Sequence, residues 1–305
     1  MKINLAVFST GRDEAAVGLL ENIVEKTDPS INVEAIVFNG NQNSTWGQKF
    51  LESANQYSDS LEGIPVFQLP YREFEPELRK AGIQEKKELG LGPGVDSPNL
   101  AEWRSDYDKW VICNTELSEI NPYIAVLVGD MVYWGKERCQ HYDAINLHPA
   151  LPDGPKGTWQ DVIWELMYNQ SEKTGAMMHL VTPDRDRGPA VTYCEFAIQG
   201  DGYVTLWERF EEKISRLETT HGLDRRKAVD LLKSQHGENE GLFKKIRREG
   251  VKREGVLVTE TLNAFGRDEI YIAERGTMKK YIFDDQDNIL KTGYDITEKV
   301  EASLT

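Results

Sequence analysis

The sequence has few cysteines and no long apolar run. Its three cysteines, Cys113, Cys139 and Cys194, are odd in number, far apart and without a C-x-x-C pair, which indicates reduced thiols rather than a disulfide framework or a metal site. No stretch approaches the roughly 18 apolar residues of a membrane span, and the apolar start at residues 3–8 is too short for the core of a signal peptide. We therefore expect a soluble, cytoplasmic protein.

Basic residues are also fewer than acidic ones. The sequence has 36 Lys and Arg and 51 Asp and Glu, which gives a formal net charge of -15. Such a charge opposes nonspecific attraction to nucleic acid and to anionic membranes. The 305 residues are enough to bury a sizeable core in one large or two modest domains. We expect a small-molecule partner rather than nucleic acid or a membrane, and we leave open whether the chain forms a homodimer.

What the sequence does contain is an alternation of short apolar strands with amphipathic segments. This pattern predicts an α/β fold, a Rossmann-like, mostly parallel sheet flanked by helices. Apolar residues recur at helical spacing within residues 13–25 and 159–167. Residues 71–117 contain a Gly/Pro stretch between charged helical segments. This pattern predicts an insertion, which is either a surface lid or an exposed segment without a catalytic role.

The last third is predicted to be helical and to end in a β-hairpin. Helices are expected at 204–217 and 224–235, with further packed helix over 243–262, and the hairpin at 269–283. The basic run at 244–253 reads as a solvated helix face because glutamates surround it. The acidic stretch at 284–288 lacks EF-hand spacing and reads as a turn. The domains expected are a catalytic domain at 1–200 that contains the insertion, a helical part at 201–266 and a hairpin tail at 267–305.

Two polar side chains stand where an apolar run ends. If residues 144–147 form a strand, Asn146 and His148 lie on the same side of it, and Pro149 stops the strand. They would then lie at the carboxyl edge of the sheet, where open α/β sheets bind ligands. Asp186 follows in a polar turn that could return a carboxylate to this edge. Taken singly, each residue is more often structural than catalytic.

The sequence motifs around these residues are more specific than the single residues. Asn-Leu-His-Pro-Ala-Leu-Pro at 146–152, then Val-Thr-x-x-x-Asp-x-Gly-Pro at 181–189, closely resemble the signature of the folate-dependent formyltransferases, and most of all the glycinamide ribonucleotide formyltransferases. The resemblance covers about Lys2 to Ile198 and, more loosely, the chain up to about Phe265. It implies strands at residues 3–9, 33–39, 63–66 and 122–131.

The resemblance also implies the site. The catalytic residues would be Asn146, His148 and Asp186. The folate pocket, lined mainly by backbone, would be formed by two segments that include the residues Val128, Gly129, Asp130, Met131, Thr182 and Asp184. The co-substrate would be 10-formyltetrahydrofolate, and the formyl group would pass from its N10 to a small-molecule amine.

This chemistry suits the three residue types. A tetrahedral species with an oxyanion forms during the transfer, and Asn146 supplies an N–H donor to it. His148 titrates near neutrality and can move the protons between the two nitrogens, while Asp186 would orient it and favour its charged form. No metal and no covalent intermediate is needed.

The acceptor is less clear than the donor. By resemblance, Thr10, Gly11 and Arg12 would bind the phosphate of glycinamide ribonucleotide, the default acceptor, in a reaction of purine biosynthesis. The next residues, Asp13 and Glu14, place negative charge where that anion would bind. Another amine, such as an amino sugar nucleotide, is therefore a variant of the same hypothesis.

Two further hypotheses differ in class. Deformylases of 10-formyltetrahydrofolate share the same Asn, His and Asp and let water attack, but we expect no counterpart of their N-terminal amino-acid-sensing domain, which makes this alternative weaker. The other alternative is a noncatalytic folate-binding protein. The presence of all three polar residues at the positions of the family pattern argues against it. The methionyl-tRNA enzyme of the family carries a basic C-terminal barrel, and the acidic chain makes tRNA a poor acceptor.

Overall fold

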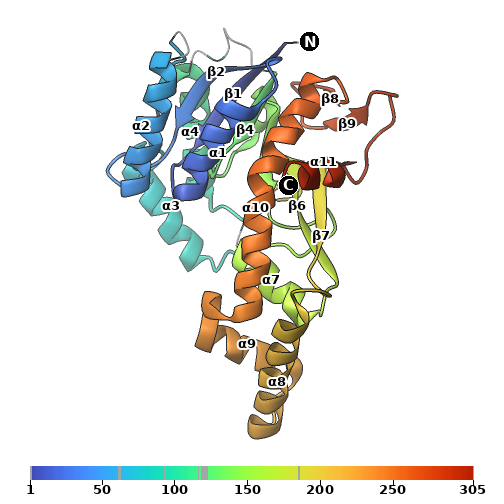
Figure 1. The fold of residues 1–305 in the computed structure, drawn as a ribbon. Coiled ribbons are helices and arrows are strands. Elements are labelled where there is room, and N and C mark those ends of the chain that lie inside the picture. Colours follow the sequence, from blue (N-terminus) through green and yellow to red (C-terminus); the bar gives the residue numbers. More distant parts are fainter. Residues whose placement is uncertain are drawn as a thin grey trace. The chain divides into compact units, whose positions relative to one another are not determined.

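The computed structural model describes residues 2–60, 63–92, 94–115, 117, 123–184 and 186–304. The chain divides into two compact units (Figure 1). Unit 1 consists of Met1–Leu147, Met178–Val191 and Val258–Tyr294, and unit 2 of His148–Met177, Thr192–Leu257 and Asp295–Thr305. The units are thus built from interleaved segments, whereas the sequence analysis divided the chain into consecutive stretches.

A parallel sheet forms the centre of unit 1. Its strands are β1 (Ile3–Ser9), β2 (Ile31–Phe38), β3 (Val66–Gln68), β4 (Ile124–Leu127) and β5 (Ala144–His148). They follow the order β3-β2-β1-β4-β5, and each neighbouring pair is parallel. The full strand order continues from β5 to β6 (Lys173–Leu180), β7 (Ala190–Ala197) and β10 (Tyr294–Asp295). The mostly parallel α/β sheet predicted from the sequence is confirmed.

Helices cover this sheet. They are α1 (Glu14–Lys26), α2 (Thr45–Ser60), α3 (Pro76–Glu88), α4 (Pro98–Asn114) and α6 (Lys136–His141). Alternate strand residues such as Ala6 and Phe8 pack with α4 and α6 in one buried cluster. The predicted helix at 13–25 is confirmed as α1, which begins where the Asp13 carboxylate accepts a hydrogen bond from the Ala16 N–H.

Helix α4 corrects the expectation of a lid or an exposed insertion at 71–117. Its residues Trp103, Tyr107 and Val111 are buried in the core of unit 1. The Asp108 carboxylate on the same helix lies 2.5 Å from the Arg138 guanidinium, and both side chains are fully buried. The 17-residue helix α4 is therefore a structural layer of the fold.

The C-terminal part of unit 1 contains the predicted β-hairpin. Its antiparallel strands are β8 (Ile270–Ala273) and β9 (Tyr281–Asp284), and the chain turns after Asp284, as expected. Before the hairpin, the end of helix α10 (Gly241–Gly266) packs on unit 1. There the Phe265 ring contacts the edge of Tyr123, and the Asn263 side chain accepts a hydrogen bond from the Asp28 N–H.

Unit 2 is mostly helical. It contains α7 (Trp159–Tyr168), α8 (Val204–His221), α9 (Arg225–His236), the short 3-10 helix Gly237–Asn239, the first part of α10 and α11 (Thr297–Ala302). Side chains from α7, α8, α9 and α10 form its core, among them Phe210 and Phe243. The helices predicted in this region are confirmed. The basic run on α10 pairs with glutamates, but it is only partly solvated, because the side chains of Arg247, Glu249 and Glu254 are mostly buried. None of the helices in the described ranges is long and apolar enough to cross a membrane.

Candidate functional site

The carboxyl ends of three neighbouring strands meet at one edge of the unit 1 sheet. In the parallel register, Phe8 of β1 lies beside Leu127 of β4, and Leu127 lies beside Asn146 of β5. The Val128 N–H donates to the Phe8 carbonyl over 2.8 Å, so the segments that leave β1 and β4 run side by side. This edge therefore brings together the predicted acceptor turn, the predicted folate segment and Asn146.

The turn after β1 is closed by its own hydrogen bonds. The Thr10 hydroxyl donates to the Gly129 carbonyl over 2.7 Å, and the Gly11 N–H donates to the Ser9 hydroxyl over 2.9 Å. The Asp13 carboxylate occupies the N-terminus of α1, where the Ala16 N–H donates to it over 3.2 Å. Donors that could surround a phosphate are thus used inside the protein, while the Arg12 side chain is exposed.

The Asp130 side chain fixes the segment after β4 from within. Its carboxylate accepts hydrogen bonds from the Val132 N–H, the Trp134 indole and the Asn39 amide, at 3.1–3.2 Å. Burial raises the pKa of this carboxyl, and the nearby Arg138 charge offsets the rise only in part. What the segment can present to a ligand is its backbone and the 49% exposed Met131 side chain.

Asn146 and His148 stand at the end of β5, as the sequence predicts. Asn146 is half-buried and His148 is 5% exposed, and their spacing of two puts them on the same side of the strand. The strand ends at His148 because Pro149 follows. Leu147 is the last residue of this segment of unit 1, and His148 is the first residue of unit 2.

Asp186 lies in the loop between β6 and β7 and is held in an uncommon backbone conformation, with φ at 50°. Its carboxylate lies 3.9 Å from Nε2 of His179, a residue of β6 whose side chain is 4% exposed. The loop is narrow, since a Cβ at Gly188 would stand 1.7 Å from the Leu180 carbonyl oxygen. Thr182 closes its first limb by donating to the Asp184 carbonyl over 2.8 Å.

His179 lies beside a predicted site residue and was not named from the sequence. The sequence pattern pairs Asp186 with His148 alone, whereas in the structure the His179 imidazole lies beside the Asp186 carboxylate. The available signal was its position seven residues before Asp186, within the stretch that resembles the family.

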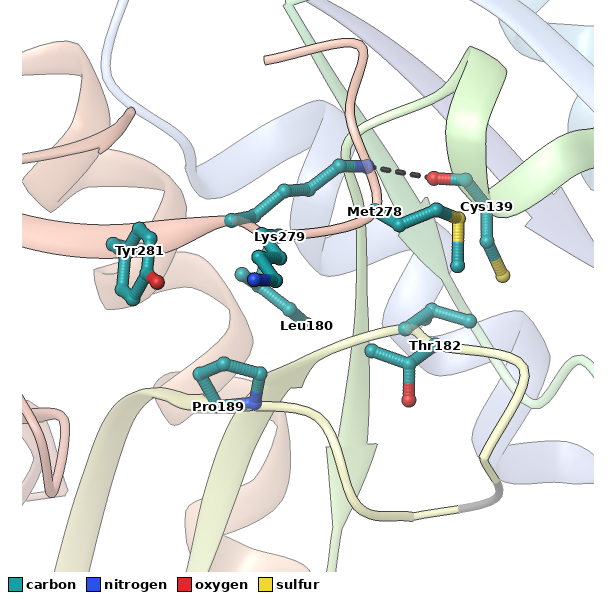
Figure 2. A pocket seen from close by; sticks show the side chains of 9 residues that line it. Cys139, Leu180, Thr182, Pro189, Met278, Lys279 and Tyr281 are labelled. Atoms are coloured by element: carbon teal, nitrogen blue, oxygen red, sulfur yellow. Dashed lines mark hydrogen bonds between the residues drawn. The ribbon is translucent and has the colours of Figure 1, made fainter. Parts of the chain in front are cut away.

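A pocket of about 260 Å³ adjoins this loop (Figure 2). Its lining comes from three parts of unit 1: Cys139 of α6, the Leu180–Thr182 segment with Pro189 at the two limbs of the loop, and residues 278–281 of the hairpin. The lining is mostly apolar. Among the described residues, no group of three or more His, Cys, Asp or Glu is placed to hold a metal ion.

Three solved structures show what the chain is similar to. Phosphoribosylglycinamide formyltransferase from Coxiella burnetii aligns with a TM-score of 0.59 at 16% identity, over 97% of this chain and 99% of that one. The enzyme of the same name from Anaplasma phagocytophilum aligns with a TM-score of 0.50 at 15% identity, over 97% and 100%. Formyltetrahydrofolate deformylase from Burkholderia mallei aligns with a TM-score of 0.51 at 13% identity, over 93% and 71%.

No family model matches the sequence, and no curated protein matches it. The likeness is therefore one of fold, carried by the parallel sheet, its covering helices and the hairpin. The residues quoted for the resemblance in the sequence lie in this fold at the end of β5 and in the loop after β6. The chain has the fold of the folate-dependent formyltransferases.

Proposed function

We propose that the protein transfers the formyl group of 10-formyltetrahydrofolate to a primary amine, with glycinamide ribonucleotide as the default acceptor. The observation that carries the proposal is the occurrence of Asn146, His148 and Asp186 at the motif positions of a chain with the formyltransferase fold. With that acceptor, the reaction would belong to purine biosynthesis in the cytoplasm.

In the proposed reaction, the acceptor nitrogen attacks the formyl carbon. The new C–N bond forms as the carbonyl oxygen takes up negative charge, and the Asn146 amide and protonated His148 donate hydrogen bonds to it. The bond between the formyl carbon and N10 then breaks. The attacking nitrogen loses a proton and N10 gains one, and His148 mediates this exchange. Asp186, whose carboxylate lies 3.9 Å from Nε2 of His179, would orient the imidazole that moves the proton.

Hydrolysis of 10-formyltetrahydrofolate is the second candidate. The closed turn after β1 favours it, because Gly11 N–H and the Thr10 hydroxyl are already engaged and Asp13 occupies the helix N-terminus. An acceptor phosphate would have to displace these contacts, whereas water needs no such binding site. The same turn also fits an acceptor amine that carries no phosphate at this position.

One experiment separates the candidates. The purified protein is incubated with 10-formyltetrahydrofolate, and release of tetrahydrofolate is followed with and without glycinamide ribonucleotide. Release that depends on the nucleotide, with its formyl derivative identified by mass spectrometry, is the expected result. Release without any amine indicates the deformylase reaction. No release in the presence of either acceptor or of a panel of other amines would contradict the proposal.

A further inference from the structure

Hydrogen bonds tie the ends of β1, β2 and β4 to one another at the carboxyl edge of the unit 1 sheet. The Asn39 N–H, just after β2, donates to the Ser9 carbonyl over 2.8 Å. The Asn39 side-chain amide donates to the Asp130 carboxylate over 3.2 Å. The Thr10 hydroxyl donates to the Gly129 carbonyl over 2.7 Å. These bonds hold the turn after β1 and the segment after β4 in one arrangement.

The Thr10 hydroxyl has a single proton to donate, and the protein uses it internally. The residue is 7% exposed, and its hydroxyl reaches a carbonyl 119 positions away in the sequence. An ionised phosphate offers acceptor oxygens, so Thr10 can donate to one only by giving up Gly129. A Cβ at Gly40 would lie 1.9 Å from the Thr10 carbonyl oxygen, so the backbone of the residue is closely packed as well. The contacts of Thr10 are those of a residue that holds the protein's own backbone.

The carbonyl that Thr10 holds belongs to a turning point of the chain. Gly129 has φ at 59°, in the left-handed region that favours glycine. The peptide group between Gly129 and Asp130 is planar, so fixing its carbonyl also fixes the direction of the Asp130 N–H. Further on, the Asp130 carboxylate accepts a hydrogen bond from the Val132 N–H. Thr10 thus fixes the start of the segment after β4, and Asp130 fixes its continuation.

We propose that Thr10 is a positioning residue for the co-substrate, and not the acceptor ligand that the sequence resemblance implies. The inference rests on the proposed function, with residues 128–131 presenting their backbone to the folate. Without the Thr10 hydroxyl, this backbone is free to leave the arrangement that binds, and the folate must restore it on binding. The affinity for the folate then falls, whereas the chemical step, which Asn146 and His148 carry, keeps its rate.

Variants that remove or keep the hydroxyl test the proposal. Tetrahydrofolate binding is measured by calorimetry on the wild type, Thr10→Val, Thr10→Ser and Thr115→Val. Valine has nearly the shape of threonine without the hydroxyl, and serine retains the hydroxyl. Thr115 is a buried threonine at the end of α4, and its hydroxyl donates to the Val111 carbonyl over 3.0 Å. It therefore matches Thr10 in burial and in the kind of bond that is lost.

We expect Thr10→Val to weaken tetrahydrofolate binding about fivefold, the effect of one ordinary hydrogen bond, and Thr10→Ser to retain most of the affinity. In turnover of 10-formyltetrahydrofolate, the KM of the folate should rise by the same factor in Thr10→Val, while kcat changes less than about twofold. Thr115→Val should bind the folate like the wild type, although thermal unfolding should show a similar loss of stability in both valine variants.

The outcomes distinguish the inference from the function on which it rests. A wild type that binds no folate overturns the proposed function and the inference with it. Wild-type affinity in Thr10→Val overturns the inference alone. So does equal weakening in Thr115→Val, because the effect is then one of general stability. A kcat that falls while the KM of the folate stays unchanged, or a rise confined to the KM of the acceptor, would also contradict the positioning role.

Discussion

At the scale of single residues, His148 and Asp186 carry the proton transfer of the proposed reaction. We expect His148→Ala and Asp186→Asn each to lower kcat about 10²- to 10⁴-fold, the usual contribution of a positioned acid or base. Asn is chosen at position 186 because it tolerates the left-handed backbone there. Turnover and the far-ultraviolet circular dichroism spectrum are measured together, with Asp285→Asn, an exposed turn residue, as the control. Full activity in either variant with an unchanged spectrum would contradict the assignment.

The buried pair of Asp108 and Arg138 makes a prediction about stability. Both side chains are fully buried, and Asp108→Ala would leave the guanidinium without its nearest counter-charge. We expect the free energy of unfolding to fall by about 3–5 kcal/mol. Asp106→Ala on the same helix removes an exposed pair with Lys109 and should cost about 0–1 kcal/mol. Urea unfolding of both variants checks this, and similar losses would show that burial of the pair does not matter.

Glu249 in unit 2 predicts an acid-dependent loss of stability. Burial raises the pKa of its carboxyl, but hydrogen bonds from Lys245 and Lys252 outweigh that effect and lower it to about 2. Because the folded-state pKa lies below the ordinary glutamate value of 4.5, the contribution is present above pH 4.5 and is lost as the pH falls toward 2.

We expect Glu249→Gln to cost about 1 kcal/mol at pH 7 and progressively less as the pH falls through this window. Urea unfolding of the wild type and the variant at pH 7, 4 and 3 measures the difference. Glu208→Gln, which removes an exposed carboxylate on α8, is the control. A difference that stays constant with pH would show that the carboxylate charge is not what stabilises the site.

Whether the sequence could predict the position of a residue depends on whether its contacts are local or come from distant parts of the chain. Asn146, His148 and Asp186 stand in short local patterns, a strand stopped by proline and a turn after a strand, so their places follow from neighbouring letters. Their predicted catalytic roles stay predictions. By contrast, Asp130 meets Asn39 across 91 positions of sequence, and Asp108 meets Arg138 across 30. Such pairings depend on tertiary structure, and the spacing of residues along a single sequence does not predict them.

At the scale of elements, strongly periodic segments were predicted well. Strand β1 has the expected bounds, and α1 and α7 begin within one residue of theirs. The burial of α4 was missed because its neighbour α3 is highly charged and a Gly/Pro stretch separates them, which together suggest an exposed region. The two-residue strand β10 and the six-residue helix α11 were missed because segments this short show no measurable period.

The close contact of α3 with α4 gives a prediction with a matched control. A Cβ at Gly82 would lie 2.5 Å from the Leu100 backbone nitrogen, whereas a Cβ at Gly18 in α1 would meet nothing within 4 Å. We expect Gly82→Ala to destabilise the protein by about 1–3 kcal/mol through overpacking. Gly18→Ala should stabilise it by about 0.5–1 kcal/mol, because alanine favours a helix. Thermal unfolding of both variants checks the signs, and a stabilising Gly82→Ala would show that the two helices are free to move apart.

At the scale of the whole molecule, the net charge of -15 governs what the protein attracts from a distance. We expect no binding to tRNA or duplex DNA at about 0.1 M salt, since few phosphates would be neutralised and the overall field repels them. Electrophoretic mobility shift assays with both nucleic acids measure this. Tight binding that weakens steeply with salt would reveal a basic surface that the net charge conceals.

The division into two units could not be predicted from the sequence. Composition changes little across the borders, and β6, β7 and α10 each continue from one unit into the other without a linker. The spacing of apolar residues predicts each of these helices and strands. It does not predict which of the two units each half of the element packs into. For that reason the sequence predicts borders at the helical region and at the hairpin, and not those of the two units.

The interleaving of the two units has a consequence for synthesis on the ribosome. The first 147 residues emerge early, but unit 1 still lacks Met178–Val191 and Val258–Tyr294, which include Phe265 against Tyr123 and the hairpin bound to Asp143. At typical translation rates these arrive on the order of ten seconds later. The nascent sheet must wait for them with part of its apolar surface uncovered. This interval is the stage at which the newborn chain most needs a chaperone.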